Sequence, residues 1–424
     1  MISGYARFVT VTYRPRLLDA KIDRKLRSSG GILLSGARHV GKTTTGLHHA
    51  NSQARLDEAA QRQLAELEPS TVLKGPTPRL IDEWQLVPEI WNTIRNAIDE
   101  RQAKGQFILT GSAAPADDIT RHTGAGRFAR LVLRPMSLAE SGDSTGQVRF
   151  ACLWDEWGGG AMGGPTVADY ADLTVRGGWP ALIGLPVLDA ADSLVDYVDN
   201  LARVDLRMLE SPPDPVRMGA LLKALARNTS TEASLTKLAA EAQLGDADLT
   251  AQTVRKYLDQ LTQINVLDEL TAWPLHLRSS VTQRMKSKWH FVDPSIAAAA
   301  LRATPSSLME DLETFGLFFE SLAIRDLRAY SDTEDADVFH YRDANGLEID
   351  AVIERPDGSW AACEVKLGGQ SAIDQAAANL SRLQSRLKPD KWASMRSLNI
   401  ITAGSTSYQR PDGIRVISLG HLYV

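Results

Sequence analysis

Short apolar runs alternate with polar and amphipathic stretches through the first third of the chain. The apolar runs occupy residues 31–35, 80–81 and 107–110, and polar or small residues follow each of them. Parallel strands that are buried on both faces have this composition, and they carry the residues after them to one edge of the sheet. The pattern predicts an α/β core in residues 1–157.

A helical spacing of apolar residues replaces this pattern in the middle of the chain. It lies between two breaks, a glycine-rich loop or linker at 158–164 and the SPPDP sequence at 211–215. We therefore expect a helical subdomain at 165–210. Its apolar face contains Leu194, Tyr197, Val198, Leu201 and Val204.

Two further helical patterns, at 234–243 and 250–264, are joined by a short turn and predict helix-turn-helix packing in a domain at 211–300. The second helix is expected to expose Gln252, Arg255 and Lys256. The stretch at 270–292 lacks acidic residues, which predicts a basic wing beside a recognition helix. An ordinary packed helix pair with a solvated basic hairpin fits the same pattern, because winged helices also contact proteins. The basic residues of that stretch are Arg278, Arg284, Lys286 and Lys288.

The last segment, residues 311–424, opens with a helical pattern and continues as strands. Asn345-Gly346 and Asp357-Gly358 separate the expected strands. Both dipeptides favour the two-residue turns of β-hairpins. We therefore expect two hairpin turns in a C-terminal domain that contains both helices and strands.

A phosphate-binding motif follows the first apolar run. The sequence from Gly36 to Thr43 matches GxxxxGK[ST], with a strand predicted before it and a helix after it. Backbone N–H groups of such a loop surround phosphates, Lys42 reaches the β and γ phosphates, and the Thr43 hydroxyl binds Mg²⁺. The sequence thus predicts a site for ATP and Mg²⁺. The expected nucleotide-binding residues are Gly36, Ala37, Arg38, His39, Val40, Gly41, Lys42, Thr43 and Thr44.

Two more strand ends carry residues suited to ATP hydrolysis. The second apolar run ends in Asp82 and Glu83, which predicts that Asp82 contacts the hydrated Mg²⁺ and that Glu83 acts beside the attacking water. The alternative is an acidic strand end that merely starts a loop. At the end of the third run, Thr110 or Ser112 is expected to orient water or to sense the γ phosphate.

Arg127 lies in a predicted loop before an apolar run, where it can act as an arginine finger on the ATP of a neighbouring subunit. A solvated loop arginine is an equally good interpretation. His48 and His49 are adjacent on a predicted helix, so we expect them to point in different directions. That expectation argues against a metal site at these histidines.

Composition adds little to these motifs. The chain has 424 residues, a formal net charge of -5 and two cysteines, Cys152 and Cys363, without CxxC spacing. These values indicate a folded protein of two or three domains without a disulfide framework or a zinc-cysteine site. No apolar stretch of about 18 residues and no signal-peptide pattern occurs, so we expect a cytoplasmic protein without membrane contact.

The P-loop, the acidic strand end and several later segments of the chain together resemble a family of bacterial and archaeal AAA-type ATPases. Members of this family have a C-terminal domain of unknown function related to restriction-endonuclease-like folds. The resemblance implies an α/β P-loop (AAA-like) ATPase core with a helical lid, a winged-helix segment and a C-terminal α/β restriction-endonuclease-like domain. It also implies a homo-oligomer, which favours the finger role of Arg127. Besides the P-loop and the acidic strand end, it rests on the order of the segments 109–112, 126–140, 177–180, 197–205 and 288–293.

The C-terminal segment is similar to the PD-(D/E)XK nuclease pattern. Its residues are Glu320 on a helix, Asp350 at the end of one strand, and Glu364 and Lys366 on one face of the next. In such a site carboxylates hold Mg²⁺ and a lysine positions water, so we expect a metal site at Glu320, Asp350 and Glu364. The alternative is a nuclease-like fold kept for binding, with solvated charges at these positions.

The favoured interpretation is an ATP-hydrolysing oligomer that acts on nucleic acid, DNA more than RNA, through the winged helix and the C-terminal domain. The competing interpretation is a regulatory ATP switch, for example in a toxin and antitoxin or stress circuit, whose C-terminal domain binds a protein partner without cleavage. The sequence leaves both open.

Overall fold

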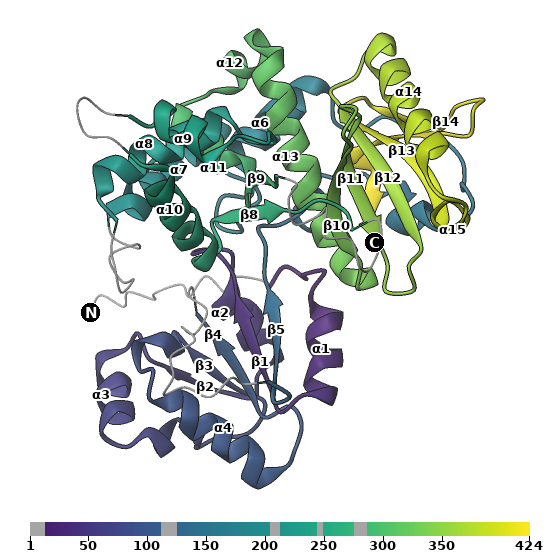
Figure 1. The fold of residues 1–424 in the computed structure, drawn as a ribbon. Coiled ribbons are helices and arrows are strands. Elements are labelled where there is room, and N and C mark those ends of the chain that lie inside the picture. The colour runs from purple at the N-terminus through teal and green to yellow at the C-terminus, as the bar shows by residue number, and fades with distance from the viewer. Residues whose placement is uncertain (1–12, 112–124, 204–212, 244–248, 275–285) are drawn as a thin grey trace, which may run out of the picture. The chain divides into compact units, whose positions relative to one another are not determined.

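The computed structural model describes residues 13–111, 125–203, 213–243, 249–274 and 286–424 (Figure 1). The chain divides into two compact units, the first within residues 1–131 and the second comprising residues 132–424 together with residues 35–40. Each unit is described by itself. None of the helices among the described residues is long and apolar enough to cross a membrane.

The first unit is built on a five-stranded sheet with strand order β2-β3-β4-β1-β5. The pairs β2·β3, β3·β4 and β4·β1 are parallel, as the buried apolar runs predicted. Strand β4 lies between the strand that precedes the P-loop and the strand with the acidic end. The strands are β1 (Gly31–Ser35), β2 (Ser52–Arg55), β3 (Arg79–Asp82), β4 (Phe107–Thr110) and β5 (Phe128–Val132).

Helices cover this sheet because alternate strand residues are apolar on both faces. Leu33, Ile81 and Leu109 pack in one cluster with the apolar face of α4. The opposite face holds Leu80, against which Gly46 of α2 lies so closely that an added Cβ would meet it at 2.8 Å. The helices are α1 (Asp19–Ser28), α2 (Lys42–His49), α3 (Ala59–Leu67) and α4 (Ile90–Arg101).

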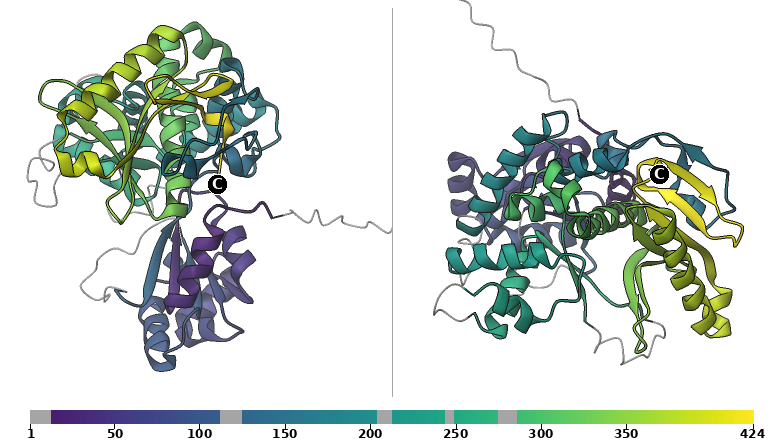
Figure 2. Two further views of the ribbon diagram at one scale, coloured as in Figure 1. Left: turned by 90° about the vertical axis from the view of Figure 1, so that its right-hand side faces the viewer. Right: turned by 90° about the horizontal axis from the view of Figure 1, so that it is seen from above.

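The second unit contains a helical part and a seven-stranded sheet (Figure 2). A two-stranded antiparallel ribbon of β8 (Leu267–Leu270) and β9 (Lys288–Phe291) follows the helices α8 to α10. The helices are α5 (Leu138–Ser141), α6 (Val167–Arg176), α7 (Val187–Arg203), α8 (Pro215–Arg227), α9 (Leu235–Glu241), α10 (Ala251–Gln263), α11 (Pro294–Leu301), α12 (Pro305–Glu310), α13 (Leu312–Ser331), α14 (Gln370–Arg386) and α15 (Pro389–Ala393).

The large sheet has the order β10-β11-β12-β13-β15-β14-β7. Its antiparallel hairpins β10·β11 and β11·β12 turn at Gly346 and Gly358, both with positive φ, so both predicted hairpin turns are confirmed. Strand β13 then joins β12 in parallel after the crossover helix α14. The strands are β7 (Ala161–Met162), β10 (Asp337–Arg342), β11 (Glu348–Glu354), β12 (Trp360–Lys366), β13 (Met395–Thr402), β14 (Thr406–Gln409) and β15 (Arg415–Ser418).

Residues 148–162 differ from the sequence-based expectation of an ATPase core at 1–157 followed by a linker. Strand β6 (Val148–Arg149) pairs with β16 (Leu422–Tyr423), and β7 pairs with β14. Between them, the Leu153 carbonyl accepts a hydrogen bond of 2.7 Å from the Ser397 hydroxyl. This stretch is therefore part of the same folded layer as the last strands of the chain.

A buried ionic network lies in the second unit. The Arg325 guanidinium of α13 pairs with the Asp293 carboxylate at 2.8 Å and with the Asp326 carboxylate at 2.6 Å. All three side chains are buried. Two carboxylates thus share one cation, and burial without that cation would be costly for both.

Three segments that carry the family resemblance meet at this network. The Gly178 N–H donates to Asp293, and the Leu138 N–H donates to Asp326, each at 2.9 Å. A Cβ at Gly178 would meet the Met136 carbonyl oxygen at 2.1 Å, so the close approach needs glycine. These three segments, far apart in the sequence, therefore build one interior.

Candidate functional site: the P-loop and the C-terminal carboxylate cluster

The loop after β1 has the backbone geometry of an anion-binding turn. Gly36 has φ 153°, and a Cβ there would meet the Leu133 carbonyl oxygen at 2.3 Å, so only glycine fits. His39 at φ 67° and Gly41 at φ 97° are also left-handed. Alternation of this kind turns successive N–H groups toward one side of the chain, which is how nests bind phosphate.

Helix α2 begins directly after this turn, and its first N–H groups suit phosphate. The residue before the helix, Gly41, supplies no side-chain cap. The N-terminal N–H groups of a helix need an external acceptor, and the helix dipole favours an anion there. Lys42, the first helical residue, is buried with 7% of its surface exposed. The donors and the cation thus fit the phosphates of ATP.

Thr43, Asp82 and Thr110 form the adjoining oxygen-rich cluster. The Thr43 hydroxyl lies 2.9 and 3.0 Å from the two Asp82 oxygens, and the Thr110 hydroxyl donates to Asp82 at 2.5 Å. Strand β4 places Thr110 opposite Asp82 in the register. Hydroxyl and carboxylate oxygens are the ligands that Mg²⁺ prefers, so these residues fit the ion that accompanies ATP.

Glu83 follows Asp82 in a left-handed conformation, with φ 55° and ψ 41°. Non-glycine residues in this region carry strain, and such residues are common at functional sites. Its carboxylate accepts a hydrogen bond from the Gln85 amide. A Cβ on Gly111 would meet the Gln85 side-chain oxygen at 2.2 Å, so Gln85 lies between the ends of β3 and β4. Sequence motifs gave no signal for Gln85.

Other sequence-predicted residues lie in different surroundings. Ser112 falls outside the described residues. Thr44 is exposed on α2, as are Arg38 and His39 in the loop, whereas Ala37 and Val40 are buried. The side chains of Ala37 and Val40, two of the predicted loop residues, are therefore part of the hydrophobic core.

Arg127 lies at the other end of β1 from the P-loop. Its backbone carbonyl accepts a hydrogen bond from the Gly31 N–H, and its side chain pairs with Asp99 at 2.7 Å. The Asp99 carboxylate raises the Arg127 pKa. A role on the ATP of another subunit stays a prediction.

The C-terminal hairpin brings together the residues of the nuclease-like pattern. Ala351 pairs with Cys363 across β11 and β12, which places Asp350 and Glu364 side by side at the next position. The Lys366 ammonium lies 3.2 Å from Asp350 and 2.7 Å from Glu364. The Val365 N–H donates to Asp350 at 2.8 Å. Lys366 thus offsets both carboxylates.

Lys288 was predicted to be one of the residues of the basic wing, and this prediction is wrong because its side chain is buried. Its ammonium lies 2.9 Å from Glu320, 2.7 Å from Glu348 and 3.7 Å from Asp350, and 1% of the residue is exposed. The three carboxylates raise its pKa although burial opposes this. Because Glu320 of α13 and Glu348 and Asp350 of β11 surround its ammonium, the lysine neutralises buried acids instead of facing solvent.

Lysines therefore lie where the sequence predicted a divalent ion. Within the described ranges, Glu320, Asp350 and Glu364 do not bring their oxygens close enough together to count as a metal-binding group of three. Burial raises the pKa of Glu320 to about 7, although Lys288 opposes the shift. The carboxylates are thus paired with the ammonium groups of Lys288 and Lys366.

Glu364 gives the cluster a testable pH dependence. Burial, reinforced by Asp350, raises the pKa of Glu364 from 4.5 to about 8. The folded chain then binds more protons than the unfolded chain between these values, so this contribution to stability is full below 4.5 and lost as pH rises through 8. We expect Glu364→Gln to flatten the fall in the free energy of unfolding between about pH 5 and 8, measured by urea denaturation. Glu313→Gln, at an exposed position, is the control; identical profiles for the wild type and Glu364→Gln would contradict this assignment.

Comparisons with known proteins agree with the first of these sites. Residues 28–142 match the family described as AAA domain. Residues 167–307 and 315–422 match two families described as domains of unknown function, DUF8612 and DUF4143. With the P-loop and the acidic strand end, the first match supports an AAA-type P-loop domain at residues 28–142.

The similar proteins are distant in sequence. The uncharacterized proteins Mb2031c of Mycobacterium bovis and Rv2008c of Mycobacterium tuberculosis are each 23% identical over 362 residues, covering 83% of this chain and 75% of the relative. The Walker-type ATPase paby2304 of Pyrococcus abyssi aligns with 67% of this chain and 94% of its own, at 13% identity and a TM-score of 0.41. AMPPCP-bound DnaA from Aquifex aeolicus aligns with 62% and 89%, at 16% identity and a TM-score of 0.27.

Proposed function

We propose that this chain is a magnesium-dependent ATPase that acts on nucleic acid. The observation that carries the first half is the cluster of Thr43, Asp82 and Thr110 beside the start of α2. In this proposal Lys42 and the loop N–H groups bind the phosphates, and Thr43 and Asp82 hold Mg²⁺. Glu83 orients and deprotonates the attacking water, with Gln85 holding its carboxylate in place.

The nucleic-acid half of the proposal rests on the helices α9 and α10 and the ribbon β8·β9. Gln252, Arg255 and Lys256 are exposed on α10 while its apolar face is buried, as a recognition helix of a winged-helix segment requires. A cavity of about 650 Å³ beside α10 is lined by residues that include Arg255, Lys286 and Trp289. Cations that line a groove suit the phosphates of a nucleic-acid backbone.

Replacing Arg255 and Lys286 with alanine together is expected to weaken DNA binding and to lower the salt slope by about one per lost phosphate contact. Fluorescence anisotropy with duplex and single-stranded DNA and RNA, at about 50–200 mM salt and with or without ATP, measures both quantities. Lys223→Ala on α8, which removes another exposed lysine, is the control. Absence of binding at every salt concentration would favour the alternative, an ATP switch with a protein partner.

For the C-terminal domain we favour binding without cleavage. The mixed sheet with α13 and α14 supports the nuclease-like fold implied by the resemblance, but Lys288 and Lys366 neutralise its carboxylates. We expect no cutting of DNA or RNA with Mg²⁺ or Mn²⁺ by the wild-type protein. Cutting that Asp350→Ala and Lys366→Ala both abolish would instead establish the metal-dependent site.

The proposed assembly is a homo-oligomer in which Arg127 reaches the ATP of the next subunit. The position of Arg127, at the end of β1 opposite its own P-loop, supports action on another chain. Its pairing with Asp99 would have to be released for that contact.

A further inference from the structure

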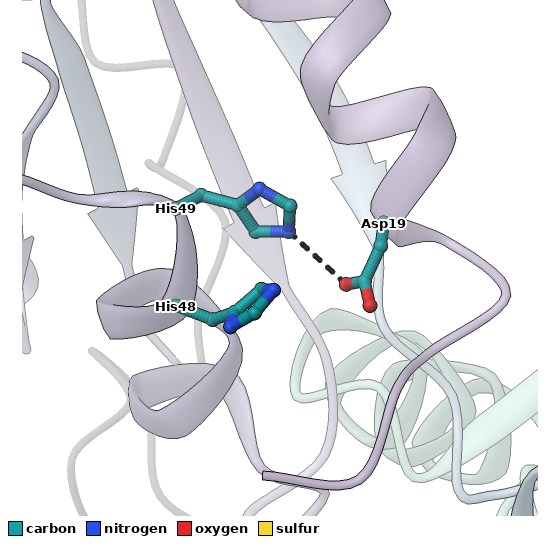
Figure 3. Close-up of side chains that lie close together, drawn as sticks. All are labelled: Asp19, His48 and His49. Atoms are coloured by element: carbon teal, nitrogen blue, oxygen red, sulfur yellow. Dashed lines mark hydrogen bonds and ion pairs between the residues drawn. The ribbon is translucent and has the colours of Figure 1, made fainter.

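Asp19, His48 and His49 gather in the first unit, at the start of α1 and the end of α2 (Figure 3). One ligand atom from each of them lies within 4.8 Å of those of the other two. Among the described residues, no other group of three His, Cys, Asp or Glu side chains meets this condition. The expectation that the adjacent histidines point apart is therefore wrong, because both rings turn toward Asp19 in the last turn of the helix.

We propose that Asp19, His48 and His49 bind one divalent transition-metal ion, Zn²⁺ foremost. Two imidazoles and a carboxylate are a donor set that suits zinc and its neighbours in the first transition series and not Mg²⁺ or Ca²⁺, which prefer oxygen ligands alone. Three protein ligands leave a fourth position for water. This site is distinct from the proposed Mg²⁺ position at Thr43 and Asp82.

Outer contacts already orient the ligands as they are oriented in metal sites. The Asp23 carboxylate lies 2.8 Å from His49 Nδ1 and accepts a hydrogen bond from its N–H, while Nε2 lies 3.0 Å from Asp19. A metal ion bound to Nε2 would replace the proton that Nε2 shares with Asp19. A carboxylate behind a ligating imidazole fixes the tautomer and raises its basicity. His49 is well covered, with 5% of its side chain exposed.

The carboxylate and the second imidazole are held as well. Asp19 accepts hydrogen bonds from the Tyr13 hydroxyl at 2.6 Å and from the Arg16 N–H at 2.8 Å. The Tyr13 ring stacks on His48, with the ring centroids 4.0 Å apart and an angle of 14°. The position at the C-terminal end of α2 adds the negative end of the helix dipole, which favours a cation. Metal binding would therefore require little rearrangement of the side chains.

The test is metal binding by the untagged full-length protein, without nucleotide, at about pH 7.5. Equilibrium dialysis against Zn²⁺, and Co²⁺ absorption with displacement by Zn²⁺, are expected to give one ion per chain. We expect His48→Ala and Asp19→Asn each to abolish this stoichiometric binding, and Asp23→Asn to weaken it by about 10- to 100-fold, the usual effect of losing an outer-shell partner. His276→Ala, which removes a histidine elsewhere in the chain, is expected to bind as the wild type does.

Two results would overturn the proposal. Zinc binding that persists unchanged in both His48→Ala and Asp19→Asn places the ion elsewhere. Lack of binding by the wild type at 100 µM free Zn²⁺ leaves the cluster as a proton-held contact between His49 and its two aspartates. Circular dichroism of each variant identifies any loss of folding, and Asp19→Asn keeps the size of the side chain so that one ligand variant stays informative. ATP turnover does not enter the test, so failure of the proposed ATPase function leaves it valid.

Discussion

Arg325→Leu is expected to lower the free energy of unfolding of the second unit by about 3–5 kcal/mol, the usual cost of removing one partner from a buried ion pair. The change leaves Asp293 and Asp326 buried without their cation. It also removes the ion pairs that hold these carboxylates in place. The carboxylates accept hydrogen bonds from the N–H groups of Gly178 and Leu138, and we expect these hydrogen bonds to weaken as well. Urea denaturation followed by circular dichroism measures the loss.

Arg342→Leu is the matched control for this prediction, because Arg342 pairs with Glu232 at an exposed position and such pairs contribute about 0–1 kcal/mol. Adding Asp326→Asn to Arg325→Leu removes one stranded charge and is expected to recover part of the loss. If Arg325→Leu and Arg342→Leu are equally stable, the network does not hold the interior together.

Local signals in the sequence predicted local structure well. The two hairpin turns follow from Asn345-Gly346 and Asp357-Gly358, since glycine at positive φ is what such turns require. Helix α13 begins one residue after Asp311, whose side chain caps it. Each of these features depends on a few neighbouring residues, so a single sequence contains the information.

Long-range pairings were not predictable in the same way. Strands β6 and β7 pair with β16 and β14, which lie more than 240 residues later in the chain. The sequence of a two-residue strand does not indicate the strand with which it pairs. The prediction for Lys288 was wrong for the same reason. A basic stretch of sequence indicates an exposed wing, but in the structure acidic residues of α13 and β11 surround this lysine. Tertiary contacts decide such positions.

The proposed nucleotide site shows both situations side by side. The proximity of Thr43 and Asp82 was predictable, because a P-loop and an acidic strand end lie at the same edge of one sheet. Gln85 was not, because an amide side chain in a loop carries no pattern, and its contact with Glu83 depends on the left-handed turn at that residue. The prediction for His48 and His49 of α2 was wrong because it assumed that neighbouring side chains on a helix must point apart. In the structure the ligand atoms of both rings lie close to Asp19.

The largest functional effects are expected at the P-loop and at the acidic strand end, and they should differ in kind. Lys42→Ala is expected to abolish tight ATP binding, since the buried ammonium at the start of α2 is the cation nearest the expected phosphates. Glu83→Gln keeps the side-chain size and is expected to retain binding while turnover falls by about 10²–10⁴-fold, the usual contribution of a general base. Binding of a fluorescent ATP analogue and release of phosphate under saturating ATP and Mg²⁺ separate the two effects.

Matched controls make this contrast specific. Lys74→Ala and Glu89→Gln remove the same charges at exposed positions of the same unit and are expected to bind and hydrolyse ATP as the wild type does. Glu83→Gln turnover at the wild-type rate would show that Glu83 is only the acidic start of a loop, with its left-handed backbone serving the turn. ATP binding by Lys42→Ala at the wild-type affinity would show that the loop N–H groups alone bind the phosphates. A loss of hydrolysis confined to Glu83→Gln would instead assign the carboxylate to the water, since binding and folding would then be intact.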